Sequence, residues 1–132
     1  MVTFADTSGL YALLDAENVG HGLAAEAWAA LREANGKTAT SSYVLLETVS
    51  LVQSRLGLDP VRDLVAGIAP LLIVEWVDRE THDAAVAALL SANRRDLSLV
   101  DCVSFEVMRR LGIRRAFTLD EHFRERGFEV VP

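Results

Sequence analysis

Short apolar runs alternate along the chain with longer stretches in which apolar residues recur at helical spacing. The short runs are bounded by turn residues and are rich in β-branched or aromatic side chains, which is typical of buried strands. We expect strands at residues 2–5, 38–41, 71–77, 115–118 and 128–131. We expect helices at residues 23–34, 42–57, 59–70, 78–90 and 98–112, and a short one after Asp6.

Capping signals support several of these boundaries. The pair Asp59-Pro60 fits an N-cap followed by proline at the first helical position. Asp78 fits the N-cap of the next helix, and Pro70 is expected to end the helix before it. Trp28 and Trp76 have apolar neighbours, so we expect both side chains in the core.

The order of the elements predicts the fold class. Strands separated by helices of this length imply right-handed crossovers and a parallel sheet covered on both faces. We therefore expect an α/β protein with three α/β/α layers and a central, mainly parallel sheet of about five strands. The 132 residues match one ordinary domain, spanning residues 1–132. Ligands of such folds bind beyond the carboxyl ends of the strands, where the strand order reverses.

Composition restricts the kinds of site and partner that the chain can have. The chain has a net charge of −6, so it has no global positive field for nucleic acid. The charge is uneven, however: residues 1–93 carry a net −7, and residues 94–132 a net +1 with arginine as their only basic residue. The single cysteine, Cys102, excludes an internal disulfide and a cysteine-based zinc site. We expect a cytoplasmic protein that does not associate with membranes, because no long apolar segment or signal-peptide pattern is present.

Two carboxylates follow predicted strands. Asp6 comes directly after the first strand, where it could also cap the short helix that follows. Asp120 comes just after the fourth strand. Thr118 and Glu121 have capping-box spacing, which assigns Glu121 a structural role and leaves Asp120 free for a cleft.

Two further carboxylates lie on apolar helices. Glu47 is surrounded by apolar neighbours one turn away, although a solvated edge position would also explain it. Asp101 falls on the apolar stripe of its helix, where an unpaired charge costs several kcal/mol. The alternative for Asp101 is a capping box with Ser98, and the two roles can coexist.

Together, the four acids predict a metal site at one end of the sheet. Converging carboxylates repel one another and take up protons, and a divalent cation removes that penalty. Ligation by oxygen alone suits Mg²⁺ or Mn²⁺, which support phosphoryl chemistry. The histidines His21, His82 and His122 are scattered, so a metal-free mechanism has no support from spacing.

These residues resemble the PIN-domain ribonucleases, and within them the VapC-type toxins of bacterial toxin–antitoxin pairs. The resemblance spans nearly the whole chain and rests on four segments and Glu47. The segments are Phe4-Ala5-Asp6-Thr7-Ser8, residues 97–105 around Asp101, residues 116–123 around Asp120, and the closing Gly127-Phe128.

The resemblance implies a PIN-like fold and a Mg²⁺- or Mn²⁺-dependent endoribonuclease. Its catalytic and metal-binding quartet would be Asp6, Glu47, Asp101 and Asp120. Ser8 and Thr118 match small hydroxyl positions beside the site. The family also implies a homodimer and a cognate antitoxin that blocks the cleft.

The RNA path is less well defined by sequence. Arg94, Arg95, Arg114 and Arg115 are candidate RNA contacts, because the acidic N-terminal part cannot attract phosphate. Two alternatives remain open: a PIN-fold RNA-processing nuclease that is not a toxin, and a non-catalytic RNA-binding module. A signalling receiver domain fits poorly, because Asp6 has no acidic neighbour and Lys37 is the only lysine.

Overall fold

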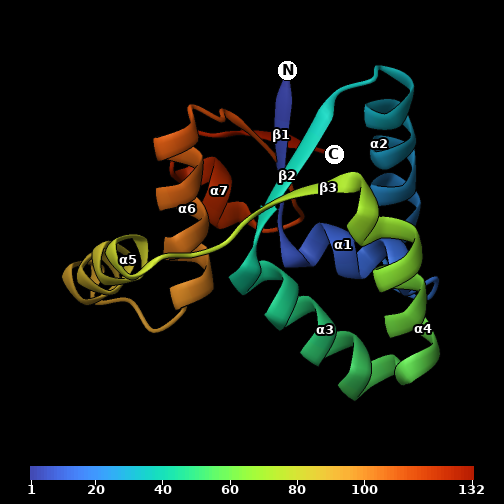
Figure 1. The fold of residues 1–132 in the computed structure, drawn as a ribbon, viewed down its shortest axis with the longest axis horizontal. Helices are drawn as coiled ribbons and strands as arrows, with labels where there is room; N and C mark the ends of the chain where they lie inside the picture. The colour runs from blue at the N-terminus through green and yellow to red at the C-terminus, as the bar shows by residue number, and fades with distance from the viewer.

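The computed structural model describes residues 1–132 and contains one five-stranded sheet in which every strand pair is parallel. The strand order is β3-β2-β1-β4-β5, so the chain builds outward from β1 in one direction and then returns to its other side (Figure 1). The strands are β1 Val2–Ala5, β2 Lys37–Ser41, β3 Leu72–Glu75, β4 Arg115–Phe117 and β5 Glu129–Val131. The point where the order reverses therefore lies between β1 and β4.

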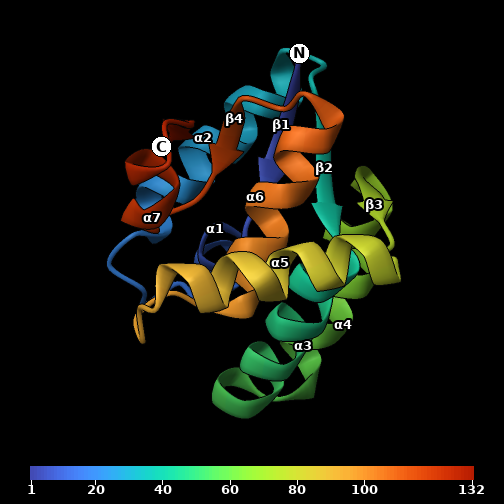
Figure 2. The same ribbon diagram turned by 90° about the vertical axis from the view of Figure 1, so that its left-hand side faces the viewer.

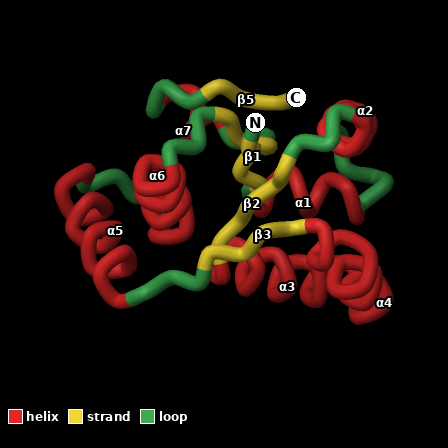
Figure 3. The backbone as a smooth tube through the Cα atoms, turned by 45° about the horizontal axis from the view of Figure 1, so that its top comes forward, coloured by secondary structure: helices red, strands yellow, loops and turns green.

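Seven α-helices connect and cover the strands. They are α1 Thr7–Leu14, α2 His21–Glu33, α3 Ser42–Leu56, α4 Leu58–Asp63, α5 Arg79–Ala92, α6 Leu99–Leu111 and α7 Glu121–Glu125. Helix α5 packs on α6, while α1 contacts both α2 and α3. Figures 2 and 3 place α5, α6 and α7 on one side of the sheet and α1, α2 and α4 on the other. The predicted three-layer α/β/α architecture is confirmed.

Aromatic side chains form the centre of the core. Phe4, Phe105, Phe117 and Phe123 are fully buried, and the rings of Phe105 and Phe123 meet edge to face with centroids 5.0 Å apart. Removing one such ring costs about 3–5 kcal/mol. These rings join β1, β4, α6 and α7. Three of the four predicted acids lie on or beside these elements: Asp6 follows β1, Asp101 lies in α6, and Asp120 lies between β4 and α7.

Glycine allows α1 to lie close to β4. A Cβ at Gly9 would come within 2.8 Å of the Phe117 carbonyl oxygen and 2.9 Å of the Phe117 ring. Any side chain at this position would push the start of α1 away from the end of β4. The close approach therefore fixes the two segments that follow β1 and β4 relative to each other.

Three local predictions were wrong. Trp76 is 74% exposed, because it follows β3 at the edge of the sheet, where no further strand covers it. The helix expected to begin at Pro60 after an Asp59 cap begins two residues earlier, at Leu58, with Gly57 as its N-cap. Pro70 does not end that helix directly, since the chain continues through the π-helical turn Leu64–Ile68 into a 3-10 turn at Ala69–Leu71.

Other boundaries agree to within a few residues. Asp78 caps α5 by accepting a hydrogen bond from the Thr81 amide, as predicted. Trp28 is half-buried and packs on the Phe117 ring, with centroids 5.7 Å apart. None of the helices is long and apolar enough to cross a membrane.

Candidate active site

A hollow of about 290 Å³ opens where the carboxyl ends of β1 and β4 meet. Its lining is mostly polar and consists of Asp6, Thr7, Ser8, Glu47, Leu51, Ser98, Asp101 and Asp120. All four acids that the sequence singled out therefore face one space, although they come from four separate segments. We call this space the acidic hollow.

Asp6 is held by two hydroxyl groups. Its Oδ2 accepts hydrogen bonds from Ser8 Oγ at 3.0 Å and from Thr118 Oγ1 at 2.9 Å. The same hydroxyl oxygens accept the backbone N–H groups of Leu119 and Asp120, at 2.8 Å and 2.9 Å. Ser8 and Thr118 thus join the end of β1 to the loop after β4 and fix the Asp6 carboxylate, which fits the supporting position predicted for them.

Burial makes the Asp6 carboxylate costly. Asp6 is only 3% exposed. This burial, together with the negative charge of Asp101, raises the pKa of Asp6 to about 6, although the hydrogen bonds from Thr118 and Ser8 oppose the shift. The ionised form of Asp6 is therefore destabilised, and a bound cation would stabilise it.

Asp101 combines the two roles considered from sequence. Ser98 Oγ accepts the Asp101 backbone N–H at 3.0 Å, and Asp101 Oδ2 accepts the Ser98 backbone N–H at 3.3 Å, which completes a capping box at the start of α6. The residue is also buried and lines the acidic hollow. Burial and the charge of Asp120 raise the pKa of Asp101, and the bonds from Ser98 only partly offset them.

Asp120 has a capping role that the sequence did not suggest. It is the N-cap of α7, and its Oδ1 accepts the His122 backbone N–H at 2.9 Å. The capping box expected between Thr118 and Glu121 is absent, because Asp120 is the N-cap of α7 and the Thr118 hydroxyl accepts the backbone N–H of Asp120 instead of that of Glu121. Glu121 is exposed and only approaches Arg124, at 3.9 Å. Asp120 nevertheless lines the acidic hollow, so capping and a site role coexist here too.

Glu47 completes the lining from α3. It is half-buried and forms no ion pair or side-chain hydrogen bond in the structure. None of the four acids has a lysine or arginine nitrogen within 4.0 Å. Four carboxylates thus share one hollow without a lysine or arginine partner, and this donor set fits a divalent cation.

His122 belongs to the site and was missed from sequence. Its Nδ1 lies 3.3 Å from Asp101 Oδ2 and 3.2 Å from Asp120 Oδ1, while its Nε2 lies 3.3 Å from Asp96 Oδ2. Burial alone would lower the pKa of His122, but the hydrogen bond to Asp96 and the charges of Asp120 and Asp101 outweigh it and raise the pKa. Asp101, Asp120 and His122 together offer three closely spaced ligand atoms to a metal ion.

The four candidate RNA-contacting arginines are divided between two places. Arg94 bonds Asp96 at 2.7 Å and Glu125 at 3.3 Å, so it reaches the edge of the acidic hollow through Asp96 and His122. Arg95 is exposed beside Arg94. Arg115 starts β4 and Arg114 precedes it, so both lie at the opposite end of the sheet from Asp120.

The chain combines a parallel sheet of this strand order with an acidic hollow where the order reverses. Comparison of its sequence with known protein families identifies the class to which it belongs. Residues 3–129 match the family described as the PIN domain, and the chain belongs to that family. The predicted PIN-like fold and the family resemblance are both confirmed.

Particular relatives cover the chain from end to end. It is 35% identical over 131 residues to the "23S rRNA-specific endonuclease VapC20" of Mycobacterium tuberculosis, in strains CDC 1551 / Oshkosh and ATCC 25618 / H37Rv, and the match covers 98% of each protein. The crystal structure of M. tuberculosis VapC20, described as a sarcin-ricin loop cleaving toxin, superposes with a TM-score of 0.86 at 33% identity and full coverage of both chains. The resemblance to VapC-type toxins is thus confirmed.

Proposed function

We propose that this protein, acting as a single nuclease unit over residues 1–132, is a metal-dependent endoribonuclease and the toxin of a VapBC-type toxin–antitoxin pair. The observation that carries the proposal is the acidic hollow, in which Asp6, Glu47, Asp101 and Asp120 converge without a lysine or arginine side chain. Membership of the PIN-domain family and the similarity to VapC20 support the same function.

The four carboxylates would hold Mg²⁺ or Mn²⁺ between them. Such an ion, when bound, lowers the pKa of water and neutralises charge on the phosphate undergoing attack. Ser8 and Thr118 keep the Asp6 carboxylate in place through their bonds to Oδ2. The bonds of Asp101 and Asp120 within the protein use Oδ2 and Oδ1 respectively, which leaves the other oxygen of each for the cation.

His122 would keep Asp101 and Asp120 in register with each other. Its Nδ1 lies between their carboxylates, and its Nε2 is anchored by Asp96, which Arg94 holds in turn. This chain of contacts fixes the side of the acidic hollow formed by α7. Arg94 and Arg95 then provide positive charge at the edge, where a phosphate group flanking the cleaved bond would lie.

The substrate that we propose is ribosomal RNA with an exposed loop. The relatives are named for cleavage of 23S rRNA and of the sarcin-ricin loop. The hollow is open and polar, which suits a sugar–phosphate backbone better than a buried small molecule. Hydrolysis by activated water would leave 5′-phosphate and 3′-hydroxyl ends, and a ribosomal substrate would place the enzyme in the cytoplasm.

Two protein partners follow from the toxin role. A cognate antitoxin would block the acidic hollow with an arginine or lysine, whose charge meets the unpaired carboxylates. A second copy of the chain would form a homodimer, as the family resemblance implies.

Cleavage of purified ribosomes tests the proposal. The enzyme should cut ribosomal RNA with Mg²⁺ or Mn²⁺, stop cutting in EDTA, and lose activity in Asp6→Asn. The matched control is Asp59→Asn, which removes a carboxylate that is 94% exposed on α4 and should cut normally. Cleavage of another RNA class would favour an RNA-processing nuclease, RNA binding without cleavage would favour a non-catalytic module, and cyclic phosphate ends would exclude activated water as the nucleophile.

A further inference from the structure

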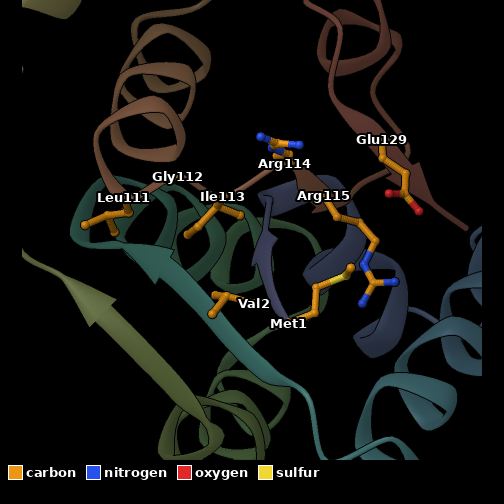
Figure 4. Close-up of a pocket in the computed structure, with 8 residues that line it drawn as sticks. All are labelled: Met1, Val2, Leu111, Gly112, Ile113, Arg114, Arg115 and Glu129. Atoms are coloured by element: carbon orange, nitrogen blue, oxygen red, sulfur yellow. The ribbon is translucent and has the colours of Figure 1, made fainter.

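The largest cavity of the molecule is not the acidic hollow. A hollow of about 490 Å³ lies at the other end of the sheet, between the starts of β1 and β4 and the turn after α6 (Figure 4). A second hollow of about 430 Å³ adjoins it and shares Arg114 and Glu129 in its lining. We call the two together the arginine hollow.

The arginine hollow concentrates positive charge in an acidic protein. Its charged lining consists of Arg109, Arg114, Arg115, Arg126 and one acid, Glu129, which gives a net charge of +3 in a chain whose total is −6. No carboxylate lies within ion-pairing distance of Arg114, Arg115 or Arg126, whereas Arg109 pairs with Glu106 at 3.0 Å. Three guanidinium groups are therefore free to bind an anion.

Two of these arginines are already positioned. Arg115 Nε donates to Thr3 Oγ1 at 2.9 Å, which holds the guanidinium over the start of β1. Arg126 lies over the Phe105 ring, with Cζ 5.0 Å from the centroid. Binding of a phosphate to these two arginines costs little side-chain entropy, because the guanidinium groups are already held in place.

The rest of the larger hollow is apolar. Val2, Leu111 and Ile113 form one wall, while Arg114 and Arg115 lie along the β4 side (Figure 4). An apolar wall beside guanidinium groups suits an unpaired nucleotide, whose base packs on the wall while its phosphate binds arginine. A volume of about 490 Å³ falls within the usual range for a small-ligand site.

A short helix connects the arginine hollow to the acidic hollow. Helix α7 begins after Asp120 in the acidic hollow and ends before Arg126 in the arginine hollow. Five helical residues span roughly 7.5 Å. The exposed side chains of Arg124 and Arg126 follow each other along this route. A strand of RNA that leaves the acidic hollow along α7 would reach the arginine hollow within a few nucleotides.

We propose that the arginine hollow is a second RNA-binding site, which takes the phosphate and base of a nucleotide outside the cleaved bond. The proposal rests on the proposed function for its choice of RNA over another polyanion. It explains how an enzyme with net charge −6 and four carboxylates at its catalytic site retains a polyanionic substrate.

The test replaces two free arginines and measures RNA binding in the intact protein. Binding of a fluorescein-labelled, mixed-sequence single-stranded RNA is titrated in EDTA at several salt concentrations. Arg114→Gln/Arg126→Gln should weaken binding about tenfold at low salt and flatten the slope of log K against log salt by roughly 1.4, for two lost phosphate contacts. With Mg²⁺, the variant should raise KM for RNA and leave kcat unchanged.

The matched control is Arg62→Gln/Arg79→Gln. It makes the same change in net charge on α4 and α5, where both arginines are exposed and paired with acids. It should keep the wild-type salt slope. Equal slopes and affinities for the two double variants would overturn the proposal.

Two further outcomes distinguish RNA binding from small-anion binding and from a failure of the nuclease function. If inorganic phosphate stabilises the wild type through Arg114 and Arg126 while RNA affinity is the same in both double variants, the hollow binds a small anion and the RNA proposal fails. If RNA is bound as expected but never cleaved, the arginine hollow stands and the proposed nuclease function fails.

Discussion

Replacing Asp6 by asparagine should stabilise the metal-free protein at neutral pH. The Asp6 carboxylate is 3% exposed, and burial raises its pKa from 3.8 to about 6. The difference between these two pKa values corresponds to about 3 kcal/mol of lost stability when the group is ionised. Asparagine has nearly the same shape, and its carbonyl oxygen can still accept the Ser8 and Thr118 hydroxyls. The variant therefore avoids most of the penalty.

The effect has a defined pH dependence. Because the folded-state pKa of Asp6 is above its unfolded value, protonation favours the folded state, and that contribution is lost as the pH rises through about 6. The advantage of Asp6→Asn should thus be about 3 kcal/mol at pH 8 and fall to about 0.5 kcal/mol at pH 4. For a chain of this size, 3 kcal/mol corresponds to roughly 10 °C in Tm.

Divalent metal should offset most of the stability advantage that Asp6→Asn has in EDTA. A ligand at a hundred times its Kd stabilises the folded state by about 2.7 kcal/mol. The wild type should gain this in Mg²⁺, and Asp6→Asn should lose most of the gain because it lacks a ligand charge.

Thermal denaturation at pH 4, 6 and 8, in EDTA and in Mg²⁺, measures both effects. Asp59→Asn serves as the control, since its carboxylate is exposed on α4 and should respond like the wild type in every condition. An Asp6→Asn protein that is no more stable than wild type at pH 8 in EDTA would refute the buried-charge reasoning. A full Mg²⁺ shift in that variant would remove Asp6 from the metal site.

Three further predictions concern neighbouring residues. Asp101→Asn should lose the Mg²⁺-induced Tm shift and RNA cleavage, whereas Ser98→Ala, which removes the other half of the capping box, should cost about 1 kcal/mol and keep most of the shift in the same melts. The cleavage rate at subsaturating Mg²⁺ should rise as the pH increases through about 6, because Asp6 must lose its proton to bind the ion; a rate independent of pH between 5 and 7 would contradict this. His122→Asn should weaken Mg²⁺ binding measured by calorimetry by about tenfold, as loss of a residue that positions metal ligands does, and unchanged binding would assign His122 a purely structural role.

The pattern of hydrophobic and polar residues was sufficient to predict the sheet and the main helices. It also predicted that the four acids meet at one end of the sheet. Asp101 and Glu47 stood out because carboxylates are rare on apolar helical faces, and Asp6 because it follows a buried strand. The strand order then brings the ends of β1 and β4 together. Pattern did not predict the environment of Trp76, because sequence does not show that β3 is an edge strand.

The remaining errors arise from side-chain competition and from geometry. Asp120 rather than Thr118 caps α7, because its Oδ1 accepts the His122 backbone N–H, while the Thr118 hydroxyl accepts the N–H of Asp120. His122 enters the site only because α7 turns it toward α6, which no local signal in the sequence shows. Arg115 and Asp120 are close in sequence, yet a strand rises about 3.3 Å per residue and carries them to opposite ends of the sheet.

Anomalous diffraction from crystals soaked in Mn²⁺ tests the central claim most directly. We predict a strong peak in the acidic hollow, between the carboxylates of Asp6 and Asp101, that is lost in Asp6→Asn and retained in Asp59→Asn. A wild-type crystal without a peak there, or with a peak that persists in Asp6→Asn, would contradict the claim that these carboxylates form one metal-binding active site.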